Sequence, residues 1–70
     1  MLEPGDLVQV NLECNIKYFW GKMALVLKNM GQDATDHANG FYYKLQFHDG
    51  SLHIFYDKEL ELISKAERKK

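Results

Sequence analysis

The stretch 41–56 constrains the fold most, because two alternating runs of apolar and polar residues meet there across Asp49-Gly50. An Asp-Gly connection between such runs is typical of a β-hairpin closed by a two-residue type I′ turn. This turn predicts that Leu45 lies opposite Ile54 and that alternate side chains point to opposite faces. The predicted inner face is apolar and comprises Tyr43, Leu45, Phe47, Leu52, Ile54 and Tyr56. The predicted outer face is mostly polar and comprises Tyr42, Lys44, Gln46, His48, Ser51, His53 and Phe55.

Two further strands are predicted before the hairpin. Residues 7–12 alternate apolar with polar side chains, which is typical of a half-buried strand with Leu12 on its buried face. Residues 22–29 are apolar on both faces. We interpret them as a strand bent between two sheets, with a short buried helix as the alternative.

The remaining segments are predicted to be loops, a turn and a fifth strand. Residues 13–21 are expected to form a folded-back loop, and residues 30–40 a long exposed loop. A turn or 3₁₀ helix at 57–59 precedes the predicted fifth strand at 60–63.

Size and cysteine content limit the class of protein. Seventy residues make one small domain, and the single cysteine, Cys14, excludes an intrachain disulfide. A lone thiol agrees with a reducing cytoplasm. No apolar run approaches the roughly 20 residues that span a bilayer, and the first five residues are unlike a signal peptide. We therefore expect a cytoplasmic protein without membrane contact.

Charge is distributed unevenly along the chain. Residues 1–63 contain five basic and nine acidic residues and have a net charge of −4, whereas residues 64–70 have a net charge of +3. Nucleic-acid binding depends on clustered Lys and Arg. The acidic body disfavours a phosphate-binding surface, and we expect a flexible basic tail at residues 64–70.

Several short motifs resemble those of the SH3-like small β-barrel, a superfold that includes KOW and Tudor-like modules. They are Pro4-Gly5-Asp6-Leu7-Val8, Gly21, Phe47-His48-Asp49-Gly50 and Glu59-Leu60-Glu61-Leu62-Ile63. The resemblance implies an all-β fold over residues 1–63, a five-stranded SH3-like small barrel with a 3₁₀ turn before the last strand.

Length and motifs are most similar to short uncharacterised bacterial or phage proteins of this superfold. Small SH3-like subunits of photosynthetic and redox assemblies are also similar at Tyr18-Phe19-Trp20-Gly21. An Ala-Leu-Tyr-Asp-Tyr-like stretch and tandem tryptophans are missing, so the resemblance does not extend to polyproline recognition.

The densest aromatic cluster, Tyr18-Phe19-Trp20, lies in the first predicted loop. Three consecutive large aromatic side chains cannot all point inward, so at least one is expected at the surface as an anchor for a partner. The alternative is that they close the end of the barrel. Tyr42 and Phe55 on the outer hairpin face are further partner-binding candidates, although cover by another strand or by the tail is the favoured explanation for Phe55.

No catalytic set or cofactor site is predicted. His48 and His53 with Asp49 or Asp57 lack the fixed spacing of a zinc site, and the loop acids Asp33 and Asp36 lack that of a calcium loop. Cys14 has no basic neighbour that would lower its pKa. We expect no cofactor and no enzymatic activity.

Three functional hypotheses remain open. The favoured one is a non-enzymatic interaction module, a small accessory protein or subunit that binds a protein partner through the loop aromatics. The alternative is a KOW/Tudor-like nucleic-acid-binding module with stacking on Tyr18 or Trp20. Its phosphate contacts would come from Lys17, Lys22, Lys65, Arg68, Lys69 and Lys70. The third is homo-oligomerisation through an exposed strand edge or Phe55.

Overall fold

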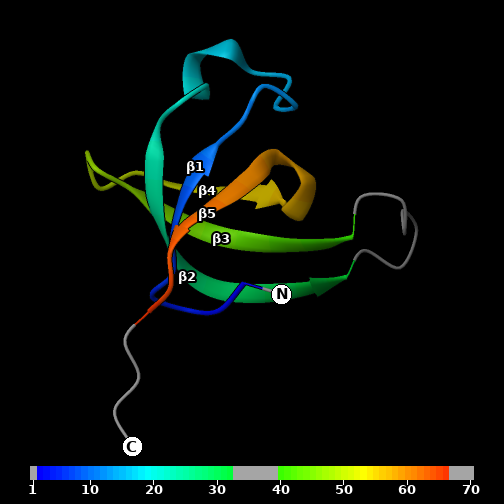
Figure 1. Cartoon of the computed structure of the whole chain (residues 1–70), viewed down its shortest axis with the longest axis vertical. Coiled ribbons are helices and arrows are strands. Elements are labelled where there is room, and N and C mark those ends of the chain that lie inside the picture. The colour runs from blue at the N-terminus through cyan, green and yellow to red at the C-terminus, as the bar shows by residue number, and fades with distance from the viewer. Residues whose placement is uncertain (1, 33–39, 67–70) are drawn as a thin grey trace, which may run out of the picture.

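The computed structural model describes residues 2–32 and 40–66, which form one antiparallel sheet of five strands (Figure 1). The strands are β1 (Leu7–Val10), β2 (Met23–Gln32), β3 (Phe41–Phe47), β4 (Leu52–Tyr56) and β5 (Leu60–Ser64). The 3₁₀ turns are η1 (Lys17–Phe19) and η3 (Asp57–Glu59). The predicted all-β class, the five strands and the 3₁₀ turn before the last strand are confirmed. The sheet has the order β4-β3-β2-β1-β5 and is not closed.

Strand β2 bends and joins the two halves of this sheet. Residues 23–25 pair with β1, and the pairing with β3 runs from Ala24 to Gln32 (Figure 1). The β2–β3 register shifts between Val26 and Lys28 and again between Asn29 and Gly31. Such bulges add a residue to one strand and increase its curvature. The expected bend is therefore present, but it lies within one sheet and not between two.

The register of the β3–β4 hairpin differs from the prediction by one residue. The amide of Phe47 donates to the Ser51 carbonyl at 2.9 Å, so the loop contains three residues instead of two. Gly50 has a φ of 87°, and no residue other than glycine has a positive φ in the described chain. A type I′ turn needs a positive φ at both Asp49 and Gly50, so this turn type is excluded. Leu45 consequently pairs with His53 and not with Ile54.

A one-residue shift reverses the faces of a strand. The prediction for β4 is therefore wrong: Phe55 is buried, whereas Leu52 and Ile54 are exposed. The prediction for β3 is correct, because Tyr43, Leu45 and Phe47 are all buried. Both faces of β4 carry apolar side chains, so its sequence pattern favours neither register.

The core lies inside the bent sheet. Its buried apolar residues are Leu2, Val8, Val10, Cys14, Phe19, Ala24, Val26, Tyr43, Leu45, Phe47, Phe55 and Leu60. Leu12 was expected to be buried but is 71% exposed, because β1 ends at Val10. Beyond it, the Asn11 side chain accepts from Glu13 N at 2.8 Å and turns the chain.

The first and last described segments are joined through Asp6, which is buried. Its carboxylate accepts hydrogen bonds from Glu3 N at 2.9 Å and from Ala66 N at 2.7 Å. The amide of Leu2 donates to the Tyr43 hydroxyl at 3.1 Å. The beginning of the predicted tail is thus held against the sheet, while residues 67–70 lie outside the described chain.

Candidate functional site

The segment 11–22 forms a loop whose two ends are tied to β1. Val10 N donates to Lys22 O and Gly21 N donates to Val10 O, both at 2.9 Å. The Gln9 side chain also donates to the Gly21 carbonyl at 3.0 Å. Gly21 has a φ of 78°, a conformation that glycine adopts without steric cost. The loop is therefore held in one shape by backbone hydrogen bonds.

The 3₁₀ turn η1 separates the three consecutive aromatic side chains. A 3₁₀ helix has three residues per turn, so neighbouring side chains point in different directions. Phe19 points into the core, where its ring lies 5.2 Å from the rings of both Phe47 and Phe55. Tyr18 is 69% exposed, which confirms that at least one aromatic reaches the surface.

Trp20 is partly exposed and its indole N–H donates to the Cys14 carbonyl at 2.8 Å. This bond spans six residues and braces the loop. The Cys14 sulfur is buried and accepts from Ile16 N at 3.4 Å. Trp20 and Cys14 together fix the shape of the loop that presents Tyr18.

A groove of about 320 Å³ lies between this loop and the β3–β4 turn. We call it the loop groove; it is lined by Tyr18, Phe19, Lys22, Met23, Phe47, His48, Asp49 and Ser51. Tyr18, Phe19, Met23 and Phe47 form the aromatic and apolar half of this lining, and the other half is polar or charged.

Two opposite charges lie among the groups that line the loop groove. The ammonium of Lys22 lies 4.6 Å from the centroid of the Tyr18 ring, a cation–π contact that positions both side chains. Asp49 accepts from the Ser51 hydroxyl at 2.6 Å and from the Ser51 amide at 2.9 Å. These hydrogen bonds hold the pKa of the Asp49 carboxyl below its ordinary value of 3.8. Asp49 is therefore anionic at neutral pH.

The same geometry argues against nucleophilic catalysis by Ser51. Its hydroxyl donates to Asp49, and a carboxyl with a lowered pKa is a poor base for activating it.

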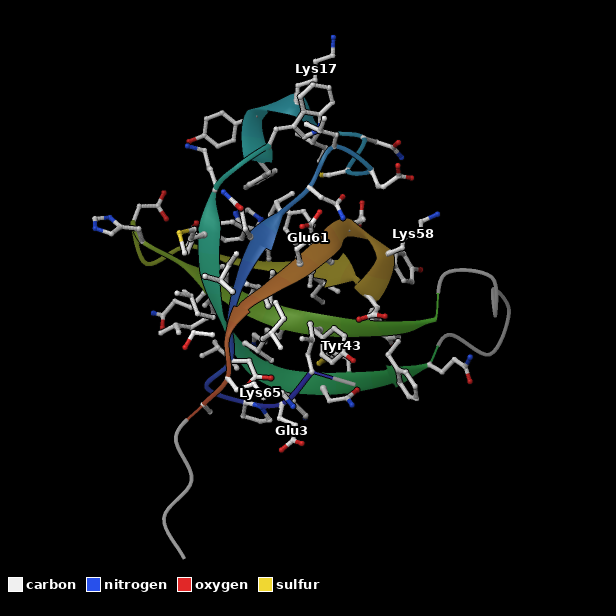
Figure 2. The ribbon with its side chains drawn as sticks, in the orientation of Figure 1. Glu3, Lys17, Tyr43, Lys58, Glu61 and Lys65 are labelled. Atoms are coloured by element: carbon white, nitrogen blue, oxygen red, sulfur yellow. The ribbon has the colours of Figure 1, made fainter. Side chains whose placement is uncertain are left out.

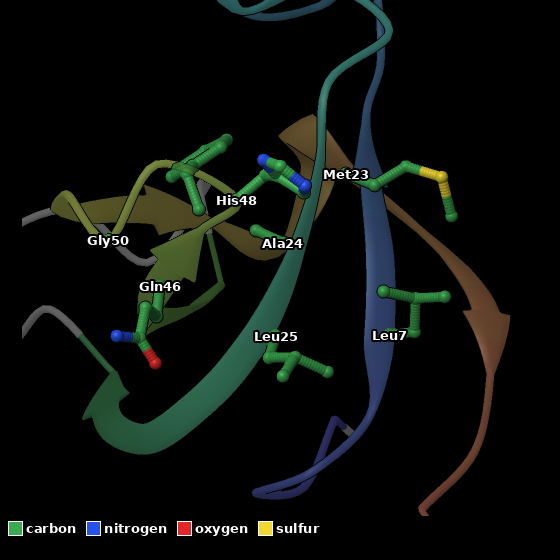
Figure 3. A pocket seen from close by; sticks show the side chains of 8 residues that line it. Leu7, Met23, Ala24, Leu25, Gln46, His48 and Gly50 are labelled. Atoms are coloured by element: carbon green, nitrogen blue, oxygen red, sulfur yellow. The ribbon is translucent and has the colours of Figure 1, made fainter.

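A second groove of about 370 Å³ adjoins the first on the outer face of the sheet (Figure 3). We call it the sheet groove; it is lined by Leu7, Met23, Ala24, Leu25, Gln46, Phe47, His48 and Gly50. Met23, Phe47 and His48 line both grooves, so the two lie next to each other. Met23 and Leu25 are exposed side chains of β2. Neither residue was predicted as a site residue, although the apolar side chains on both faces of this segment were a signal for an exposed apolar surface.

The other predicted partner-binding residues lie elsewhere. Phe19 and Phe55 are buried, so the expectation of Phe55 on an outer face is wrong and neither side chain is available at the surface. Tyr42 is half-buried and packs against Tyr56 with ring centroids 5.9 Å apart. It lies at the end of β3 away from the loop groove.

The lysines proposed for phosphate contacts are spread over the molecule. Lys17 lies at one end of the long axis and Lys65 near the other (Figure 2). Lys17 Nζ is 5.7 Å from the Trp20 ring centroid. Arg68, Lys69 and Lys70 lie outside the described residues, as do the loop acids Asp33 and Asp36.

The described residues contain neither a metal-binding cluster nor a membrane-spanning helix. No group of three His, Cys, Asp or Glu side chains in residues 2–32 and 40–66 is arranged to hold a metal ion. None of the helical segments in these ranges is long and apolar enough to cross a membrane. Comparison of the chain with protein-family models, with curated proteins and with solved structures found no match.

Proposed function

We propose that the protein is a non-enzymatic interaction module of the SH3-like type that binds a protein partner through the loop groove. The observation that carries this proposal is an open groove with aromatic walls, bounded by one rigid loop and one tight turn. The long first loop, the tight turn between β3 and β4 and the 3₁₀ turn before β5 support the SH3-like resemblance.

An extended peptide is the partner that fits this groove best. Met23, an exposed lining residue, offers apolar surface to a side chain of the peptide, and Tyr18 adds a large rigid contact at low entropic cost. Lys22 and Asp49 offer opposite charges that pair with carbonyl and amide groups of a peptide backbone. The loop hydrogen bonds preorganise these groups, which reduces the entropic cost of binding.

Selection from a random peptide library displayed on phage tests the proposal. Tyr18→Ala removes a side chain that lines the groove, and Leu12→Ala removes a similarly exposed side chain of the same loop that does not. We expect the selected peptides to lose at least about tenfold in affinity for Tyr18→Ala and to bind Leu12→Ala like the wild type. Equal binding to both variants, or a library that yields no binder, would contradict the proposal.

A nucleic-acid-binding module is the second candidate. The specific observation in its favour is that Lys17 and Lys22 each place an ammonium near an aromatic ring of the same loop. Bases stack on exposed rings and phosphates pair with lysines. Binding of single-stranded oligonucleotides at about 50 mM salt, weakened by added salt and by Lys22→Ala, would favour this candidate over a peptide.

A further inference from the structure

We propose that two copies of the chain associate through the outer edges of their β4 strands, forming one antiparallel sheet across a two-fold axis. Strand β4 ends the sheet, and within the described residues it pairs with β3 alone. A strand at such an edge presents backbone N–H and C=O groups to any strand that approaches it.

The hairpin register identifies which backbone groups point outward. Phe47 N donates to Ser51 O, so the backbone of Ser51, His53 and Phe55 faces β3. The backbone groups of Leu52 and Ile54 therefore face away from the sheet. Their side chains are exposed as well, by 49% and 57%.

The edge lacks the features that usually prevent association. The residues Leu52–Tyr56 include no acidic or basic residue other than His53, and no proline or glycine. By contrast, the opposite edge strand, β5, contains Glu61, and its register against β1 shifts between Leu7 and Val8. Edge strands normally use charges, prolines or bulges against self-pairing.

One register satisfies the geometry of a two-fold axis. Leu52 of each copy lies opposite Ile54 of the other, so that both residues exchange backbone hydrogen bonds, and the two His53 residues face each other. Shifting the register toward Tyr56 would require its amide, which already donates to Glu59 Oε1 at 2.9 Å. Shifting it the other way would require Gly50, whose φ of 87° is not extended.

A second copy is the occupant that this edge favours. Residues 52–54 include no Lys, Arg, Asp or Glu, so this segment meets the same segment of a second copy without a pair of such charges, although the chain as a whole is acidic. A groove of about 200 Å³ runs beside the edge, with Ile16 among its lining residues. This exposed isoleucine adds apolar surface next to the incoming strand.

The expected dimer is weak and leaves the loop groove free. A ladder this short buries less than the roughly 1,600 Å² of a standard protein interface, so we expect a reversible, concentration-dependent dimer. None of the residues that line the loop groove belongs to β4. An experiment can therefore contradict dimerisation and leave peptide binding supported, or contradict peptide binding and leave dimerisation supported.

Sedimentation equilibrium over a wide concentration range tests the dimer. The average mass of the wild type should rise with concentration from 8.2 kDa toward twice this value. The variant Ile54→Lys should associate at least about tenfold more weakly. Ile63→Lys, at a similarly exposed site on β5, should associate like the wild type. A wild type of 8.2 kDa at all concentrations, or a dimer that Ile54→Lys leaves intact, would overturn the proposal.

Oxidative cross-linking tests the register. His53→Cys places two thiols on facing residues, where a disulfide can form, whereas Leu52→Cys places them on positions separated by about 7–8 Å or more. We expect His53→Cys to cross-link and Leu52→Cys to remain monomeric on denaturing gels. The wild type, with only the buried Cys14, is the control. Preferential cross-linking of Leu52→Cys would overturn the register and with it the proposal.

Discussion

The ring of Phe19 meets the ring of Phe55 edge-on, with centroids 5.2 Å apart and planes at 83°. This contact attaches the first loop to strand β4, and Phe47 and His53 complete the cluster around Phe19. Because Phe19 is anchored in the core, its neighbour Tyr18 is held at the surface in a defined position. The candidate binding surface is therefore anchored directly to the folded core through Phe19.

Replacing Phe19 by alanine should lower the free energy of unfolding by about 3–5 kcal/mol, because it leaves a cavity in this cluster. Tyr18→Ala, at an exposed site in the same turn, should change it by less than about 1 kcal/mol. Urea denaturation followed by Trp20 fluorescence measures both values. Similar losses in the free energy of unfolding for the two variants would contradict the placement of Phe19 in the core and of Tyr18 at the surface.

Gly5 should tolerate alanine less well than Gly21. Both residues have a positive φ, of 92° and 78°, which costs an alanine about 1–2 kcal/mol. A Cβ on Gly5 would in addition lie 2.9 Å from Ala66 Cβ, whereas a Cβ on Gly21 meets no described atom within 4 Å. Thermal denaturation should show the larger loss for Gly5→Ala. Adding Ala66→Gly to Gly5→Ala should remove the extra loss, and failure of this rescue would contradict the close approach of the two residues.

The Asp49 carboxyl should titrate below its ordinary pKa of 3.8, because it accepts hydrogen bonds from the Ser51 hydroxyl and amide. A folded-state pKa below the unfolded one stabilises the protein above the unfolded pKa, and this stabilisation is lost as the pH falls through the folded value. Ser51→Ala should move the titration back toward 3.8 in an NMR experiment. The prediction fails if Asp49 titrates alike in both proteins.

Stability should decrease at alkaline pH through Tyr43. Burial raises the pKa of its hydroxyl above the ordinary value of 10.0, so the unfolded state loses this proton first. The contribution of the protonated Tyr43 hydroxyl to the free energy of unfolding is fully present below pH 10.0, and it decreases as the pH rises toward the folded-state pKa. Tyr43→Phe should flatten this dependence in urea denaturation at pH 9 to 11. It should also cost about 1–3 kcal/mol at neutral pH, because the Leu2 amide loses its acceptor.

The sequence predicted the strands well because their patterns are local. Alternation in 7–12, the glycine at 21 and the run 60–63 each indicate an element without reference to the rest of the chain. The face of β4 was predicted wrongly because Asp49-Gly50 fits both a two-residue and a three-residue loop. Phe55 is the buried residue in the folded chain, where the rings of Phe19 and Phe47 pack against it, and Phe19 is distant in sequence.

The candidate site was predicted in part. Tyr18 was identified from the crowding of three aromatics, but the opposite wall of the groove comes from His48, Asp49 and Ser51. These residues adjoin Tyr18 only because the first loop folds over the hairpin turn. Sequence spacing contains no signal for that contact.

NMR titration tests most directly whether the loop groove binds an extended peptide. A peptide selected on the wild type is added to ¹⁵N-labelled protein, and amide shifts are mapped along the chain. We expect the largest changes at Lys22, Met23, His48, Asp49 and Ser51, which line the groove. Changes concentrated on β5 or on the Tyr42 end of β3, with the groove amides unmoved, would contradict the account.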